Sequence, residues 1–231
     1  MQTEVNTVDF EPGTGRALAY GWKRMKANAL LFLLAAFVAI VIDIPMQGNT
    51  MEFGGAGIDA LFALLFFAYA LLFHPVVDYG ISFIFLKGVR GDQVQIQSVF
   101  DGFKNYVNII LASLLVFGLV IIGLIVFIVP GIYVACRLAF VSYLVMDEGL
   151  DPVAAVEASW RLTKGHAFKI FLLGVTCIFM FLGGLILLLV GVLPAIMWAC
   201  SSFAALYLSI SQNSEPMGEQ PAATDELFEE T

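Results

Sequence analysis

Three side chains that could carry acid–base or ion chemistry lie inside otherwise apolar stretches: Arg137, Asp78 and His74. A charged side chain at the centre of a bilayer costs at least about 2.5 kcal/mol, so Arg137 needs a partner in protein or water. His74 lies one helical turn from Asp78, which puts the two on one helix face. Counted from the cytoplasmic ends of their apolar runs, Asp78 and Arg137 have similar depths, so we predict that they form an ion pair.

Three roles fit this intramembrane polar cluster. The pair could clamp two membrane-spanning helices together as a purely structural contact. With His74 nearby, it could instead belong to a proton or ion pathway. Arg137 could also bind the phosphate of a membrane lipid.

Other chemistry is not indicated by the sequence. The second histidine, His166, lies in a polar segment at a different depth from His74, so a metal or haem site is not expected. Cys136, Cys177 and Cys200 lie in apolar runs without C-x-x-C spacing, which is typical of packed free thiols. Phosphate-loop, serine-hydrolase and zinc-hydrolase motifs are missing from the sequence. We therefore expect no catalytic residue, cofactor or metal, and a protein that is not an enzyme.

The composition is typical of a membrane protein, because 60% of the 231 residues are hydrophobic and only 13% are charged. The net charge of −8 comes mostly from the C-terminal residues 215–231, which hold six acids and no base. Without them the chain has 13 acids and 11 bases, a net charge of −2. This balance does not suit nucleic-acid binding. We expect the acidic tail, residues 213–231, to be disordered and cytoplasmic.

Six apolar runs predict six transmembrane helices arranged as three hairpins, an all-α polytopic fold spanning residues 15–212 after a cytoplasmic segment of residues 1–14. Pro75 predicts a kink or a break in the long second run. The fourth run is short and requires snorkelling or a thinned bilayer. The runs are residues 29–46, 61–86, 107–129, 131–146, 168–190 and 193–211.

Every lysine and arginine except Arg137 falls on one side of this topology, in residues 16–26, 87–104 and 161–169. The intervening segments, residues 43–59, 129–131 and 190–194, contain none. Short cytoplasmic loops retain Lys and Arg, so both termini are predicted to be cytoplasmic.

A short helix is predicted before each odd-numbered span, in residues 15–26, 98–106 and 151–166. Trp22, Phe103 and Trp160 occupy matching small–aromatic–basic positions in these segments, which favours amphipathic helices lying in the membrane interface with an aromatic anchor. The alternative is that they are cytoplasmic ends of the spans. The matching positions also suggest three repeated units, each an interfacial helix followed by a hairpin.

Residues 126–173 resemble the membrane domain of the glycerophosphoryl diester phosphodiesterase membrane-domain family and its stand-alone bacterial relatives. These share a Pro-Gly turn, a span containing an arginine, an acidic-Gly pair and an A-x-x-x-S-W-x-L-T-x-G segment. The matching positions here are Pro130, Gly131, Arg137, Glu148, Gly149, Ala155, Ser159, Trp160, Leu162, Thr163 and Gly165. The resemblance implies six membrane helices in a bacterial or archaeal cytoplasmic membrane, and it transfers no activity.

These observations lead to two hypotheses of function. The first is a non-enzymatic scaffold, assembly factor or accessory subunit of a membrane complex. The second is a small transporter or lipid-handling protein that uses the Arg137–Asp78–His74 cluster. The expected partners are membrane lipids, proteins of such a complex, or further copies of the chain.

Overall fold

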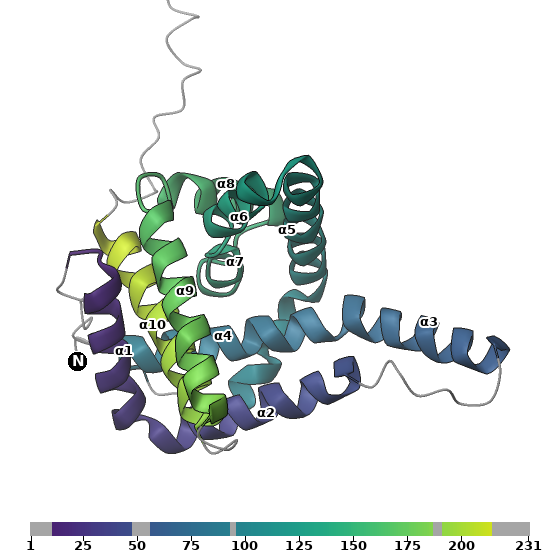
Figure 1. Ribbon diagram of the computed structural model, residues 1–231, viewed down its shortest axis with the longest axis horizontal. Helices are drawn as coiled ribbons and strands as arrows, with labels where there is room; N and C mark the ends of the chain where they lie inside the picture. Colours follow the sequence, from purple (N-terminus) through teal and green to yellow (C-terminus); the bar gives the residue numbers. More distant parts are fainter. Residues whose placement is uncertain (1–10, 48–55, 93–95, 187–190, 214–231) are drawn as a thin grey trace, which may run out of the picture.

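A computed structural model describes residues 11–47, 56–92, 96–186 and 191–213, and these residues form helices and no strand (Figure 1). The first half contains α1 (Thr14–Ala27), α2 (Ala29–Gln47), α3 (Ala56–Leu72), α4 (His74–Arg90) and the 3-10 helix η1 (Ile96–Asn105). The second half contains α5 (Tyr106–Val126), α6 (Ile128–Arg137), α7 (Val141–Asp147), α8 (Pro152–Leu162), α9 (Ala167–Ile186) and α10 (Val192–Asn213).

Five helical stretches are long and apolar enough to cross a membrane: Ala60–Arg90, Ser98–Val126, Ile128–Asp147, Ala167–Ile186 and Val192–Asn213. The pair formed by α1 and α2 would make a sixth, but the chain bends by 100° between them. The predicted all-helical, multi-pass character is confirmed at this level. Two predicted segments lie largely outside the described residues. These are the tail of residues 213–231, of which only Asn213 is described, and the N-terminal segment of residues 1–14, of which residues 1–10 are not described.

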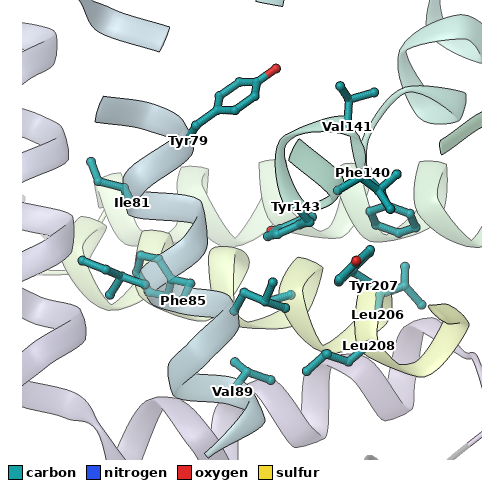
Figure 2. Close-up of a cluster of buried hydrophobic side chains, with 14 of the residues drawn as sticks. Tyr79, Ile81, Phe85, Val89, Phe140, Val141, Tyr143, Leu206, Tyr207 and Leu208 are labelled. Atoms are coloured by element: carbon teal, nitrogen blue, oxygen red, sulfur yellow. The ribbon is translucent and has the colours of Figure 1, made fainter. Parts of the chain in front are cut away.

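The core lies where α4, α7 and α10 meet (Figure 2). Phe85 of α4 and Leu144 of α7 are fully buried, and Tyr207 of α10 is 1% exposed. The Tyr207 ring stacks on Tyr143 at 5.0 Å and meets Phe140 edge-on at 5.5 Å. Lipid tails are as apolar as these side chains, so close packing rather than escape from water holds such helices together.

The first predicted amphipathic segment is a helix, α1, that packs along α10. A Cβ on Gly21 would lie 2.7 Å from Oγ of Ser202, so only glycine permits this approach. The Trp198 indole donates a hydrogen bond to the Leu18 carbonyl at 2.9 Å, and its ring lies 4.7 Å from that of Trp22. One side of α1 is therefore covered by protein.

The second predicted amphipathic segment, η1, lies along α4. Val99 is 2% exposed, and its carbonyl touches the place where a Cβ of Gly80 would stand. The Val76 carbonyl similarly lies 2.6 Å from where a Cβ of Gly102 would be. Gly80 and Val76 belong to the first half of α4. The helix η1 therefore packs against that half, which precedes the last turn of α4 that carries Lys87 and Arg90.

Helices α3 and α4 form an almost continuous rod that projects from the body of the molecule (Figure 1). The break falls at Phe73, two residues before Pro75, which lies in the first turn of α4. Proline lacks an N–H and its fixed φ suits a helix start, so the break follows from this residue. The structure divides the long second run into two helices at Phe73, and these together still form one candidate span, Ala60–Arg90.

Helices α6 and α9 run in the same general direction, because residues 129–136 of α6 lie beside residues 167–171 of α9, and residues 132–139 lie beside residues 170–178. Strict alternation of six spans would make these two helices antiparallel. The structure differs from the predicted topology here. A tight turn at Phe127 joins α5 to α6, and a Cβ on Gly131 would lie 2.8 Å from the Leu124 nitrogen.

Candidate functional site

Arg137 ends α6 and is only 4% exposed. Its guanidinium carbon lies 4.6 Å from the Trp160 ring centroid and 5.9 Å from that of Tyr133. The two rings meet edge-on, 6.2 Å apart at 88°, and enclose the cation on two sides. Such cation–π contacts contribute about 0.5–2 kcal/mol, which offsets part of the burial of the charge.

Two hydroxyl groups of α8 bind the backbone at the end of α6. The Ser159 hydroxyl donates to the Arg137 carbonyl at 2.9 Å, and the Thr163 hydroxyl shares its proton between this carbonyl, at 3.1 Å, and the Ser159 carbonyl, at 2.7 Å. The carbonyl needs these donors because the amide of Val141, four residues on, bonds to Leu138 instead. Ser159 and Thr163 lie one turn apart on α8, and both are fully buried.

No carboxylate lies within 4.0 Å of the Arg137 guanidinium in the part of the chain that the structure describes. Nε of Arg137 is buried without a hydrogen-bond acceptor. The predicted ion pair with Asp78 is wrong, because the salt bridges among the described residues do not include it. Asp78 and Arg137 would have matching depths only if the helices that carry them were straight and alternated in direction. The turn at residues 138–140 and the docking of α8 instead turn Arg137 toward Trp160.

Asp78 and His74 belong to a second cluster, which the structure completes with Asp43 of α2. Nε2 of His74 lies 2.8 Å from Oδ1 of Asp43. All three side chains line a small cavity of about 80 Å³. The prediction that His74 and Asp78 share a helix face is consistent with this arrangement. Asp43 was missed, although an acid inside the apolar run of residues 29–46 is itself a signal of a buried partner.

A third polar cluster joins the ends of α4, α7 and α10. Arg90 binds the Asp147 carboxylate with both guanidinium nitrogens, the NH1–Oδ1 distance being 2.8 Å. The Tyr207 hydroxyl donates to Glu148 at 3.3 Å. Burial raises the pKa of Glu148 above its usual range, the tyrosine hydrogen bond acting in the opposite direction. This pairing could not be predicted from the sequence, because Arg90 and Asp147 are 57 residues apart in the chain.

The three predicted aromatic anchors are each 39–40% exposed. Trp22 lies against Trp198, with Nζ of Lys26 5.4 Å from its ring. Phe103 packs 5.8 Å from Phe73, over the break between α3 and α4. Trp160 covers Arg137. Each ring therefore has one face on protein and one edge free, and their depth in a membrane stays a prediction.

The residues of the family motif gather around α6 and α8. Pro130 and Gly131 lie in the first turn of α6, against the end of α5. Gly149 and Gly165 have φ angles of +65° and +81°, which glycine adopts without strain, and they form the turns on either side of α8. The other motif residues on α8, Ala155 and Leu162, are buried. Of these positions, Ser159, Trp160 and Thr163 contact Arg137.

Metal chemistry has no support in the described residues, where no group of three or more His, Cys, Asp or Glu side chains is placed to hold a metal ion. Cys136, Cys177 and Cys200 are free thiols of intermediate exposure.

No family model, no curated protein and no solved structure matches this chain.

Proposed function

We propose that this chain is a non-enzymatic integral membrane protein that serves as a scaffold, assembly factor or accessory subunit of a larger membrane complex. The proposal includes a relationship to the glycerophosphoryl diester phosphodiesterase membrane-domain family, which residues 126–173 resemble. The gathering of that motif's residues around Arg137 supports the resemblance, because the motif then has one structural role.

The observation that carries the proposal is the exposure of α3. Every residue from 60 to 65 is exposed, and Leu61, Leu64 and Phe67 are 55–64% exposed. These positions sweep around the helix, so α3 shows apolar side chains in all directions. Helix α3 contacts α2, α4 and α5 but projects away from the body of the molecule (Figure 1). A helix of this kind is suited to packing against another protein's membrane helix.

Photo-crosslinking in the native membrane tests this role. A photoreactive amino acid at Leu65 of α3 should give one discrete crosslinked protein. The same group at Phe179 of α9, which is 69% exposed but belongs to a packed helix, should give lipid adducts only. Equal patterns from the two positions, or lipid adducts alone from Leu65, would contradict the scaffold role.

The proposal also places the protein in the cytoplasmic membrane of a bacterium or archaeon, with both termini cytoplasmic. The Lys and Arg pattern supports this orientation. In a cysteine-free background, single cysteines at Glu11 and Asn213 should react with a membrane-impermeant maleimide only after permeabilisation. Labelling of either site in intact cells would contradict the orientation.

A second candidate function, proton or cation transport, is favoured by the cavity that Asp43, His74 and Asp78 line. Intramembrane carboxylates beside an imidazole are the groups used in proton relays. Proteoliposomes loaded with a pH-sensitive dye would test it under an imposed gradient. If the protein transports protons, the wild type should give a proton flux that Asp78→Asn abolishes. The absence of proton flux with both the wild type and the variant would eliminate this candidate.

A further inference from the structure

An apolar groove runs between α6 and α9. Two adjoining hollows of about 340 and 360 Å³ share the side chains of Ile132, Cys136 and Phe171. The first begins at the start of α9, with Ala167 and Phe168, and the second continues along α9 to Ile178. Each has the volume of a small-ligand pocket. Because the two helices run in the same direction, the groove follows both over several turns.

One end of the groove lies beside Arg137. Tyr133 lines the first hollow, and the Arg137 guanidinium lies behind this ring, with 5.9 Å between its carbon and the ring centroid. The Trp160 ring centroid lies 4.6 Å from the same guanidinium carbon. Tyr133 is 50% exposed and Trp160 is 40% exposed, so both rings that contact the guanidinium are also open to the surroundings of the protein.

The charge at this end is positive. Arg137 is buried, and within the described residues it has neither a carboxylate within 4.0 Å nor an acceptor for Nε. Arg161, in the last turn of α8, and Lys164, in the turn that follows, are both exposed and come shortly before the residues that begin the groove. A buried cation is retained when something compensates it, and among the described residues only the two aromatic rings do so, and only in part.

We propose that this groove binds a phospholipid, with its phosphate on Arg137 and an acyl chain between α6 and α9. A guanidinium presents paired N–H donors that match two phosphate oxygens, and it prefers this geometry to a single point contact. The nearly apolar walls suit a hydrocarbon chain, and the exposed Arg161 and Lys164 attract an anionic headgroup. This inference stands apart from the proposed scaffold role, since it concerns α6 and α9 rather than α3.

Lipid binding to the full chain in detergent tests the inference. The probes are dioctanoyl phosphatidylglycerol, dioctanoylglycerol with the same chains but no phosphate, and inorganic phosphate alone. Native mass spectrometry measures occupancy, and thermal unfolding measures stabilisation by the bound ligand. We expect the phospholipid to bind and raise the Tm, and Arg137→Met to weaken its binding about tenfold or more. Arg24→Met should bind normally, because Arg24 also lies on an aromatic ring but on α1.

A second variant fills the groove without touching the cation. Gly174 lines the second hollow, and a Cβ there would have no heavy atom within 4 Å, so Gly174→Phe should fold. It should weaken phospholipid binding while Arg137 is intact. Three results would each overturn the inference: unchanged binding in Arg137→Met, equal stabilisation by dioctanoylglycerol, or equal stabilisation by inorganic phosphate, which would indicate a free-anion site.

Discussion

Arg90 and Arg137 are two arginines at the ends of helices, and they meet opposite surroundings. Arg90 ends α4 and forms a forked pair with Asp147, whose side chain is 14% exposed. Arg137 ends α6, is 4% exposed, and has aromatic rings rather than a carboxylate around it. The first arginine is satisfied by the fold itself. The fold positions the second arginine but gives it no carboxylate partner among the described residues.

This difference separates a structural charge from an available one. Removing one member of a buried ion pair leaves the other charge uncompensated, which costs several kcal/mol. Removing a cation that lacks a partner leaves no such charge behind. Mutational stability therefore distinguishes the two arginines, and the lipid experiment then asks what the second one is available for.

The largest effect should come from the paired arginine. Arg90→Ala leaves Asp147 nearly buried without its counter-charge, so we expect a loss of about 2–4 kcal/mol in the free energy of unfolding. Thermal unfolding in detergent measures it. Arg16→Ala is the matched control, because the Arg16–Glu11 pair is 57% and 83% exposed and should contribute less than about 1 kcal/mol. Equal losses of unfolding free energy from the two variants would show that the Arg90–Asp147 pair contributes no more than the exposed Arg16–Glu11 pair.

The next effect concerns the carbonyl that ends α6. Ser159→Ala or Thr163→Ala alone leaves one hydroxyl donor on the Arg137 carbonyl, so each should cost about 1 kcal/mol. The double variant leaves the buried carbonyl without a donor and should cost more than the sum of the two. Ser113→Ala, whose hydroxyl bonds only to its own helix, is the control for losing a serine hydroxyl. Strict additivity would show that another donor replaces the lost ones.

Arg137→Met should change the free energy of unfolding by less than about 1 kcal/mol. Loss of the cation–π contacts with Trp160 and Tyr133 destabilises the variant. Removal of an uncompensated charge from an apolar environment acts in the opposite direction. Denaturation in lipid-free detergent, beside Arg90→Met, makes the comparison direct. A loss as large as that of Arg90→Met would mean that Arg137 has a charged partner after all.

The smallest effect should come from Glu148, whose pKa in the folded state is raised by burial. The folded state then holds the proton more tightly than the unfolded state, so this group stabilises at low pH. That contribution is fully present below the unfolded pKa and is lost as the pH rises through the folded pKa. Glu148 is exposed, which limits the effect to a few tenths of a kcal/mol. The Tm of Glu148→Gln minus the Tm of the wild type should therefore be larger at pH 7.5 than at pH 4. An equal Tm difference at the two pH values would contradict the raised pKa.

The helices and their apolar character could be predicted from the sequence because they depend on local features. The long apolar runs form helices, and Pro75 marks the break between α3 and α4.

The partners of the charged residues could not be predicted in the same way. The Asp78 prediction failed because depth along a straight helix says nothing about a turn at residues 138–140 or about the side on which α8 docks. Asp43 and Asp147 meet their partners only after distant helices pack. The lone positive charge of Arg137 was visible in the sequence, and its aromatic enclosure was not.

The rod formed by α3 and α4 sets a condition on the membrane itself. Its candidate span, Ala60–Arg90, has 31 residues, about 46 Å of helix at 1.5 Å per residue. The hydrocarbon core of an average bilayer measures about 30 Å. The mismatch is relieved by steep tilt, by flexing at Phe73, or by a locally thicker bilayer, each at a modest cost per ångström. Bilayer thickness, set by acyl-chain length, therefore becomes a variable that adjusts the angle at which α3 leaves the body of the protein.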